Sequence, residues 1–372
     1  MTSWKIYKIS DIGRIVTGKT PKTSIQENYG GDVPFLTPSD DLTGKYSPKT
    51  SKTLTQVGLS EVKNCLLPAN SICVSCIGSD LGKVVKVTQP TVTNQQFNSI
   101  IPNCDFDADF VYYLMTIVGK QLNYLSKTST AVPIINKTQF SNFEVRVPSL
   151  EEQRRIAGIL GAIDDKIENN RRINTNLELQ AQALYKQWFV DNRSDDWETL
   201  MLDDVATLSA GGDKPQVCSD KKTPDCKIPI YSNGIDDEGL YGYTNNPRIK
   251  ENSITISARG TIGFVCLRTE PYVPIVRLIS VVPTYENMSA YFLYLWALTQ
   301  NISGTGTTQQ QLTVPAFRTT KIVVPSQNVL IKFNQVVKPI FDSIKQNKKE
   351  NETLATLRDT LLPKLMNGEI KM

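Results

Sequence analysis

The stretch SLEEQRRIAGILGAIDDKIENNRRINTNLELQAQALYKQWFV occupies residues 149–190 and decides the fold. Ser149 lies three positions before Glu152, a spacing typical of the capping box that begins a helix. A helix of this length, about 60 Å, cannot bury an apolar stripe alone, so it requires a partner helix. Mostly apolar residues follow in alternating steps of four and three, which indicates a coiled-coil seam: Ile156, Leu160, Ile163, Ile167, Asn170, Asn174, Leu177, Ala181, Leu184 and Trp188.

The partner helix is predicted by a second copy of the pattern, 177 positions further along. Asn170 and Asn174 of the first copy correspond to Asn347 and Asn351 of the second, and polar seam residues fix the register of a coiled coil. We therefore expect residues 149–192 and 326–372 to form two long antiparallel helices. The seam of the second copy is Phe333, Val337, Ile340, Ile344, Asn347, Asn351, Leu354, Arg358, Leu361 and Leu365.

The segments before the two helices also repeat. PANSICVSCIGSDLGKV (68–84) matches KENSITISARGTIGFV (250–265), and both alternate like a strand, a glycine-rich turn and another strand. FVYYLM (110–115) and YFLYLW (291–296) each predict a short buried helix. The predicted class is mixed α/β (α+β), with two pseudo-repeated domains, residues 1–148 and 193–325, separated by two long antiparallel coiled-coil helices.

Composition limits the possible functions. The chain is 40% hydrophobic and 21% charged, as in ordinary globular proteins, and it contains no histidine, the commonest general base and metal ligand. A net charge of +4 is small for a protein that grips nucleic-acid phosphates unaided, so we expect a partner to supply charge. With neither an apolar signal core nor a long apolar run, we expect a cytoplasmic protein without membrane contact, whose seven cysteines are free thiols.

Two local motifs have competing interpretations. GRIVTGKT (13–20) matches the P-loop pattern, but Pro21 follows directly and no helix-forming sequence comes after it, so coincidence is favoured over nucleotide binding. Cys73 and Cys76 have the spacing of a zinc or redox site, yet they lie in a predicted strand, where small buried residues are the better explanation. We expect no catalytic, cofactor-binding or metal-binding residue in this chain.

Three stretches resemble the specificity subunit of Type I restriction-modification enzymes: VPSLEEQRRIAGILGAID (147–164), AQALYKQWFVD (181–191) and LLPKLMNGEI (361–370). The resemblance covers essentially the whole chain, including the order of the repeat. It implies two target recognition domains that each read half of a split double-stranded DNA site, and helices that separate them and bind two modification subunits. Those subunits use S-adenosylmethionine to methylate adenine, and restriction subunits use ATP and Mg²⁺. The resemblance also implies that the specificity subunit is not catalytic.

Candidate DNA contacts are polar and basic loop residues, because Arg and Lys suit guanine, Asn and Gln suit adenine, and hydroxyls adapt to either. A nucleotide-dependent enzyme that uses residues 13–20 and a two-headed protein-binding adaptor remain alternatives. Each candidate taken singly is as well explained as a solvated loop residue. The candidates are Lys19, Thr20, Lys22, Ser39, Asp40, Ser79, Asn94, Gln95, Gln96, Thr128, Thr130, Lys214, Ser232, Asn233, Arg259, Thr261, Arg277, Thr305, Thr307, Thr308, Gln309 and Gln310.

Overall fold

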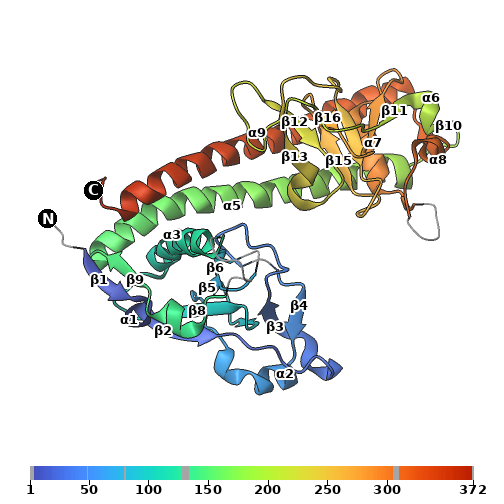
Figure 1. Ribbon diagram of the computed structural model, residues 1–372. Coiled ribbons are helices and arrows are strands. Elements are labelled where there is room, and N and C mark those ends of the chain that lie inside the picture. The colour runs from blue at the N-terminus through green and yellow to red at the C-terminus, as the bar shows by residue number, and fades with distance from the viewer. Residues whose placement is uncertain (1–3, 48, 79–80, 128–133, 305–309, 371–372) are drawn as a thin grey trace. The chain divides into compact units, whose positions relative to one another are not determined.

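The computed structural model describes residues 4–47, 49–78, 81–127, 134–304 and 310–370 (Figure 1). The chain divides into two compact units: unit 1 contains Met1–Arg171 and Lys349–Met372, and unit 2 contains Arg172–Lys348. Each unit combines one α/β domain with part of two long helices, α5 (Leu150–Lys186) and α9 (Gln327–Met366). Domain 1 is the part of the chain before α5, and domain 2 is the part between α5 and α9.

Domain 1 is built from three small sheets. A four-stranded antiparallel sheet has the order β2-β8-β5-β6, a three-stranded sheet the order β4-β3-β7, and β1 pairs with β9. Four short helical segments, α1 (Ile9–Ile12), α2 (Gln56–Glu61), η1 (Gln26–Asn28) and η2 (Lys63–Cys65), connect them. The strands are β1 (Lys5–Lys8), β2 (Gly13–Thr17), β3 (Tyr29–Leu36), β4 (Lys52–Leu54), β5 (Ile72–Ser75), β6 (Val84–Lys86), β7 (Val92–Thr93), β8 (Phe97–Pro102) and β9 (Glu144–Val147).

Domain 2 repeats this topology strand for strand. Its sheets have the orders β11-β17-β14-β15 and β13-β12-β16, and β10 pairs with β18. The internal repeat and the mixed α/β class predicted from the sequence are confirmed. The strands are β10 (Glu198–Met201), β11 (Ala206–Ala210), β12 (Ile228–Tyr231), β13 (Leu240–Thr244), β14 (Ser253–Ile256), β15 (Val265–Arg268), β16 (Val273–Pro274), β17 (Ile279–Pro283) and β18 (Lys321–Val324), with helical segments α6 (Leu202–Val205), η4 (Asp236–Gly239), α7 (Ala290–Leu298) and α8 (Val314–Arg318).

One helix in each domain packs on the four-stranded sheet. α3 (Ala108–Lys127) lies over β5 and β6, and α7 lies over β14 and β15 (Figure 1). The prediction of a short helix at 110–115 is wrong in length, because α3 continues through Lys127, whereas α7 ends at Leu298. A further short helix, α4 (Lys137–Ser141), precedes β9 and is capped by the side chain of Asn136.

The seams of the long helices form part of each unit's core. In unit 1, the seam residues Ile156 and Leu160 of α5 and Leu365 of α9 are buried in one cluster with residues of α3, and so is Leu362, the neighbour of the seam position Leu361. In unit 2, the rings of Tyr185, Phe189, Phe292 and Phe333 cluster, with Phe189 and Phe333 centroids 4.7 Å apart. Burial of large apolar and aromatic surface is the main stabilising contribution in both cores.

The helices pair antiparallel within each unit, as predicted. In unit 1, Asn170 Nδ2 donates to Asn351 Oδ1 at 2.9 Å; in unit 2, Asn347 Nδ2 donates to Asn174 Oδ1 at 2.8 Å. Asn170 is buried and the other three asparagines are half-buried, so a shift of register would leave polar groups of the helix seam without their partners. The helix start at Ser149 is confirmed by its hydroxyl, which accepts from the N–H of Glu152 at 3.4 Å.

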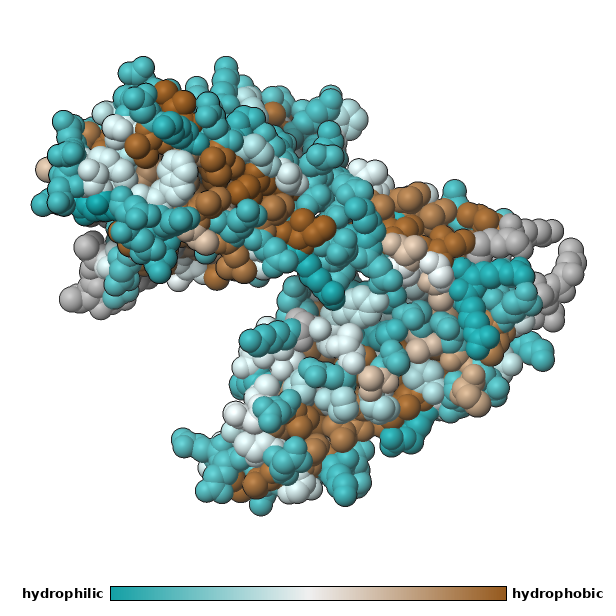
Figure 2. Space-filling model, turned by 180° about the vertical axis from the view of Figure 1, so that it is seen from behind, coloured by the Kyte–Doolittle hydropathy of each residue, from teal (hydrophilic) through white to brown (hydrophobic). Residues whose placement is uncertain are grey.

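Hydrophilic residues predominate on the face shown in Figure 2, and hydrophobic residues gather there in patches. Ile159 of α5 in unit 1 is 40% exposed and Val336 of α9 in unit 2 is 42% exposed. They are 177 positions apart and therefore equivalent in the two helix copies. Their exposure identifies a surface of each helix that its own unit does not cover. The large exposed hydrophobic residues of α5 and α9 are Ile159, Ile173, Leu179, Ile331, Val336 and Leu357.

Candidate nucleic-acid interface

Two parallel strands bring polar loops together in domain 1. β3 pairs in parallel with β7, so that Leu36 lies opposite Thr93. Because parallel strands end at the same edge of a sheet, the loop 37–40 after β3 lies beside the loop 94–96 after β7. The N–H of Asn94 donates to the carbonyl of Leu36 at 3.1 Å and fixes this arrangement.

The loop after β2, with the sequence GKTP (18–21), lies beside the same two loops. The N–H of Lys19 donates to the last carbonyl of β7 at 2.9 Å, and the hydroxyl of Thr20 donates to Gln95 Oε1 at 2.7 Å. Position 18 must be glycine, because a Cβ there would lie 2.1 Å from the carbonyl oxygen of Asn94. Lys19, Thr20, Asn94, Gln95 and Gln96 are thus brought together from segments more than 70 residues apart in the sequence.

Domain 2 has an equivalent group of loops. β12 pairs in parallel with β16. The GGDKP loop (211–215), which follows β11, contacts the turn after β16. The N–H of Arg277 donates to the carbonyl of Gly211 at 2.8 Å. Asn233, in the loop after β12, donates to the carbonyl of Val276 at 2.7 Å and accepts from the N–H of Ala258 at 2.7 Å. Ser232, Asn233, Arg259 and Arg277 therefore belong to one set of neighbouring loops.

Other candidates in domain 2 are placed differently. Arg259 Nη2 donates to Gln311 Oε1 at 3.0 Å, which orients this exposed guanidinium. The hydroxyl oxygen of Thr261 is buried without a partner among the described residues, and Gln310 is exposed. Lys214 Nζ lies 5.1 Å from the centroid of the Tyr241 ring. Hydrogen bonds to the side chains of Cys218, the larger effect, and Tyr241 raise the pKa of Lys214. The remaining candidates, Ser79, Thr128, Thr130, Thr305, Thr307, Thr308 and Gln309, lie outside the described residues.

Two of the candidates, Asp40 and Asn233, have structural roles that the sequence did not reveal. Asp40 Oδ2 accepts from the N–H of Thr37 and Oδ1 accepts from the N–H of Ser51, each at 2.8 Å. Burial opposes ionisation, but these hydrogen bonds outweigh it and lower the pKa of Asp40. The neighbouring Ser39 hydroxyl shares a hydrogen bond with Thr37 at 2.7 Å. Asp40 therefore shapes its loop, as Asn233 does in domain 2, and both act on the positions of other side chains.

Arg248 is a basic residue of this region that was not predicted. It lines one pocket together with Gly212 and Lys214. A Cβ at position 212 would lie 2.8 Å from Arg248 Nη1, so the guanidinium rests directly against this glycine. The available signal was the turn sequence TNNPRIK (244–250), in which Asn, Pro and a basic residue fall together. Lys214 and Arg248 thus form a basic pair beside the loop cluster of domain 2.

The P-loop interpretation of residues 13–20 fails on structural grounds. A P-loop needs a helix whose first N–H groups face the phosphate. Residues 13–17 form β2, residues 18–25 are not helical, and the next element is the three-residue η1. Lys22 belongs instead to a surface turn, where its N–H donates to Glu61 Oε2 at 3.0 Å.

Cys73 and Cys76 are buried at the centre of domain 1, as expected. Both are at most 1% exposed, and burial raises the pKa of the Cys73 thiol to about 12 and that of Cys76 to about 11. Among the residues that the structure describes, no three Cys, Asp or Glu side chains are placed to hold a metal ion. Within the same residues, none of the helices has the length and apolarity needed to cross a membrane.

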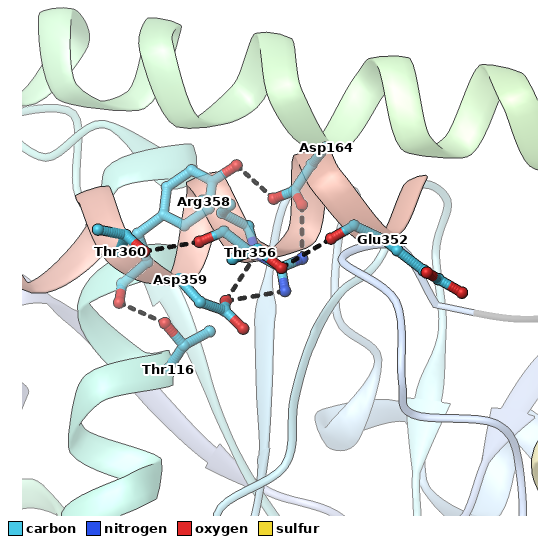
Figure 3. Close-up of polar contacts among 8 residues, drawn as sticks. Thr116, Asp164, Glu352, Thr356, Arg358, Asp359 and Thr360 are labelled. Atoms are coloured by element: carbon cyan, nitrogen blue, oxygen red, sulfur yellow. Dashed lines mark hydrogen bonds and ion pairs between the residues drawn. The ribbon is translucent and has the colours of Figure 1, made fainter. Parts of the chain in front are cut away.

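A buried polar network holds domain 1 against both long helices of unit 1. Asp164 of α5 accepts from the hydroxyl of Tyr113 on α3 at 2.6 Å and from Arg358 Nη1 on α9 at 2.8 Å (Figure 3). Arg358 also donates to Asp359 at 2.9 Å. Domain 2 has its own contact of this kind, in which the hydroxyl of Tyr294 on α7 donates to Glu178 of α5. These bonds fix the orientation of each domain relative to the helices of its own unit.

Comparison with known proteins identifies the family. Residues 1–179 and 194–356 match the model of the Type I restriction modification DNA specificity domain. The Type I restriction enzyme MjaIX specificity subunit of Methanocaldococcus jannaschii is 29% identical over 99% of this chain and 94% of its own length. The HindI specificity subunit of Haemophilus influenzae is 36% identical over 45% of this chain and 38% of its own length.

A solved structure agrees on the fold. The S subunit of a Type-I restriction-modification system from M. genitalium superimposes with a TM-score of 0.57 at 18% identity, over 98% of this chain and 96% of that one. Two family domains in tandem, each with a long helix, define the class of protein. The chain belongs to the Type I restriction-modification specificity subunit family, and the resemblance found in the sequence is confirmed.

Proposed function

We propose that this chain is the DNA sequence-recognition subunit of a Type I restriction-modification system, in which each domain contacts one half of a bipartite, gapped site. One observation carries the proposal: the two domains have loops at the ends of equivalent strands but different side chains on them. Gln96 in domain 1 and Arg277 in domain 2 occupy the matched position. Different base-contacting side chains on one scaffold are what two different half-sites require.

The partners in this proposal are two methyltransferase subunits and restriction subunits. The methyltransferase subunits contribute S-adenosylmethionine and methylate adenine, the restriction subunits use ATP and Mg²⁺, and this chain is not catalytic. Ile159 and Val336, exposed at equivalent helix positions, suit two copies of one partner. A net charge of +4 also favours a complex in which partners add contacts to DNA phosphates. With cellular DNA as its target, the complex acts in the cytoplasm.

Methylome sequencing of a host that carries this chain and its methyltransferase tests the proposal. We expect one asymmetric motif with a fixed gap and methylated adenine in its half-sites. A continuous motif, or unmethylated DNA despite an assembled complex, would contradict the two-domain geometry. DNA binding measured across salt concentrations, with and without the methyltransferase, separates this proposal from a protein-binding adaptor, which shows no salt-dependent DNA binding in either state.

The partner surface has its own test. Ile159→Glu and Val336→Glu place a charge on exposed apolar positions and should each weaken capture of the methyltransferase, because a charge buried at an interface lacks a counter-ion. Gln346→Glu, at another exposed position of α9, is the matched control and should leave capture unchanged. Equal capture by all three variants would place the partner on another surface.

A further inference from the structure

The turn after β16 has a backbone that ordinary residues rarely adopt. Val276 and Arg277 have φ angles of 50° and 62°, in the left-handed region that favours glycine. Both side chains are exposed, so core packing does not explain the conformation. Strained residues of this kind persist only where their surroundings hold them, and they gather at functional sites.

Domain 1 shows that this backbone is not required by the fold. The matched residues Gln95 and Gln96 are not among those with positive φ. The match rests on equivalent hydrogen bonds: the N–H of Gly18 donates to the carbonyl of Phe97 at 3.1 Å, and the N–H of Gly211 to that of Leu278 at 2.8 Å. The strained turn is therefore a specific property of domain 2.

Asn233 explains how domain 2 accommodates the turn. In domain 1, the N–H of Cys76 donates to the carbonyl of Gln96 at 2.8 Å. In domain 2, the equivalent N–H of Ala258 donates instead to Asn233 Oδ1 at 2.7 Å. The side chain thus replaces a backbone carbonyl and releases the turn from the position that it has in domain 1. The same amide then holds the turn, since its Nδ2 donates to the carbonyl of Val276 at 2.7 Å.

The GGDKP loop holds the turn from its other side. The N–H of Val276 donates to the carbonyl of Gly212 at 2.9 Å, and the N–H of Arg277 to that of Gly211 at 2.8 Å. Three hydrogen bonds to side-chain and backbone atoms thus fix two consecutive residues. The direction in which the Arg277 side chain leaves the backbone is set before any ligand binds.

Arg277 has no side-chain hydrogen bond or ion pair with any residue that the structure describes. Arg259, by contrast, is oriented by Gln311. A phosphate contact needs only a positive charge, which a flexible lysine supplies, and Lys214 and Arg248 already lie beside this cluster. A guanidinium that is exposed, unpaired and fixed at its backbone suits a contact that demands geometry, and its planar fork matches O6 and N7 of guanine.

We infer that Arg277 reads a guanine in the major groove of the half-site contacted by domain 2, and that Asn233 is its positioning residue. The inference rests on the proposed function. It adds the base that is recognised, the residue that contacts it and the residue that orients that contact. Domain 1, with amides at the matched position, reads its half-site by a different chemistry.

The test uses the full chain in complex with its methyltransferase and a duplex that carries the wild-type motif. Each guanine of the domain 2 half-site is replaced in turn by 7-deazaguanine, which lacks the N7 acceptor. We expect one replacement to weaken wild-type binding about 5- to 150-fold. Arg277→Ala should bind the natural duplex more weakly by a similar factor and should not respond to that replacement. Methylation by this variant should relax at that single position.

Two further variants complete the test: Asn233→Asp separates positioning from folding, and Lys214→Ala shows what the loss of a sequence-independent contact looks like. Asn233→Asp keeps the acceptor for Ala258 but loses the donor to Val276, and it should reduce the 7-deazaguanine effect while its melting temperature stays close to that of the wild type. Lys214→Ala should weaken binding to all sequences alike. The inference is overturned if Arg277→Ala behaves like Lys214→Ala, with a uniform loss and a salt slope reduced by about one. A wild-type complex without any gapped motif would instead overturn the proposed function.

Discussion

Replacing Arg358 with methionine tests the network that joins domain 1 to the helices of unit 1 (Figure 3). The side chain of Asp164 is 5% exposed, and its counter-ion Arg358 is 26% exposed. Arg358→Met keeps most of the apolar stem but leaves a buried carboxylate without its charge partner, which typically costs about 3–5 kcal/mol. We expect about 3 kcal/mol, the lower end, because Tyr113 still donates to Asp164 and water reaches part of the arginine.

Thermal unfolding followed by circular dichroism measures the effect. A loss of about 3 kcal/mol corresponds to a decrease in Tm of about 6–12 °C for a domain of 150–250 residues. Lys166→Met is the matched control, because Lys166 and Glu350 also bridge α5 and α9 in unit 1 but are 47% and 42% exposed. An exposed pair contributes about 1 kcal/mol or less, so the control should lose no more than about 4 °C.

The double variant Asp164→Asn/Arg358→Met refutes or supports the reasoning. If an unpaired buried charge causes the loss, removing the charge should restore most of the stability, since asparagine still accepts from Tyr113. A double variant as unstable as Arg358→Met alone would show that lost packing of the arginine stem is responsible. An Arg358→Met protein as stable as the Lys166→Met control would show that the pair does not stabilise unit 1.

Three more outcomes follow from single residues. Burial raises the pKa of Asp109, but hydrogen bonds from Lys45 and Lys86, each at 2.8 Å, lower it more. The stabilisation by the ionised Asp109 carboxylate is fully present above its unfolded-state pKa of about 3.9 and is lost as the pH falls through its folded-state pKa. In urea denaturation, the wild type should therefore be more stable than Asp109→Asn by a constant amount from about pH 5 to 7. This difference should shrink below about pH 4. Iodoacetamide at pH 8 should modify the exposed Cys104 and spare Cys73 until unfolding, as mass spectrometry can show. Gly18→Ala should lower the Tm because its Cβ meets a carbonyl, whereas Gly158→Ala, open to solvent in α5, should gain about 0.5–1 kcal/mol.

The long helices could be predicted from the sequence because their signals are local and repeated. Ser149 caps α5 as its spacing to Glu152 indicated, and predicted seam residues such as Ile156, Leu160, Ala181, Phe333, Val337 and Leu365 are buried in the two cores. At three predicted positions, Leu184, Trp188 and Leu361, the neighbouring Tyr185, Phe189 and Leu362 are the more deeply buried residues. The paired asparagines could be predicted as well, since polar residues at seam positions must find each other across the helix pair. Because the pattern repeats after 177 residues, the same signals predicted the second long helix as well as the first.

The arrangement of the loops could not be predicted, because it depends on strand pairing between distant segments. Thr20 and Gln95 are 75 residues apart and meet only because β7 pairs in parallel with β3. Polar loop residues also have two possible uses, and composition does not distinguish them. Asp40 bonds its own loop, whereas the Arg277 guanidinium has no partner among the described residues. The length of α3 was missed because its match with the shorter α7 concealed its continuation.

The comparison of the two domains explains how specificity can change without loss of the fold. Some of the hydrogen bonds that close the loops run from backbone to backbone, as at Gly18 and Gly211, so these do not depend on which side chain is present. The exposed position 277 can then be exchanged at a stability change usually within about 0.5 kcal/mol, whereas Gln96 is half-buried and its Oε1 accepts from Asn94 Nδ2 at 2.9 Å. Other positions hold a loop through their side chains, as Asp40 does in domain 1 and as Asn233 does in domain 2, where it replaces the carbonyl of the turn. An arginine placed at position 96 of domain 1 would therefore lack the backbone that orients Arg277 in domain 2. The position of domain 1 that corresponds to Asn233 is Pro38, whose side chain cannot make the hydrogen bonds of Asn233. Moving the proposed guanine contact to domain 1 therefore requires Arg277 and Asn233 to be transferred together.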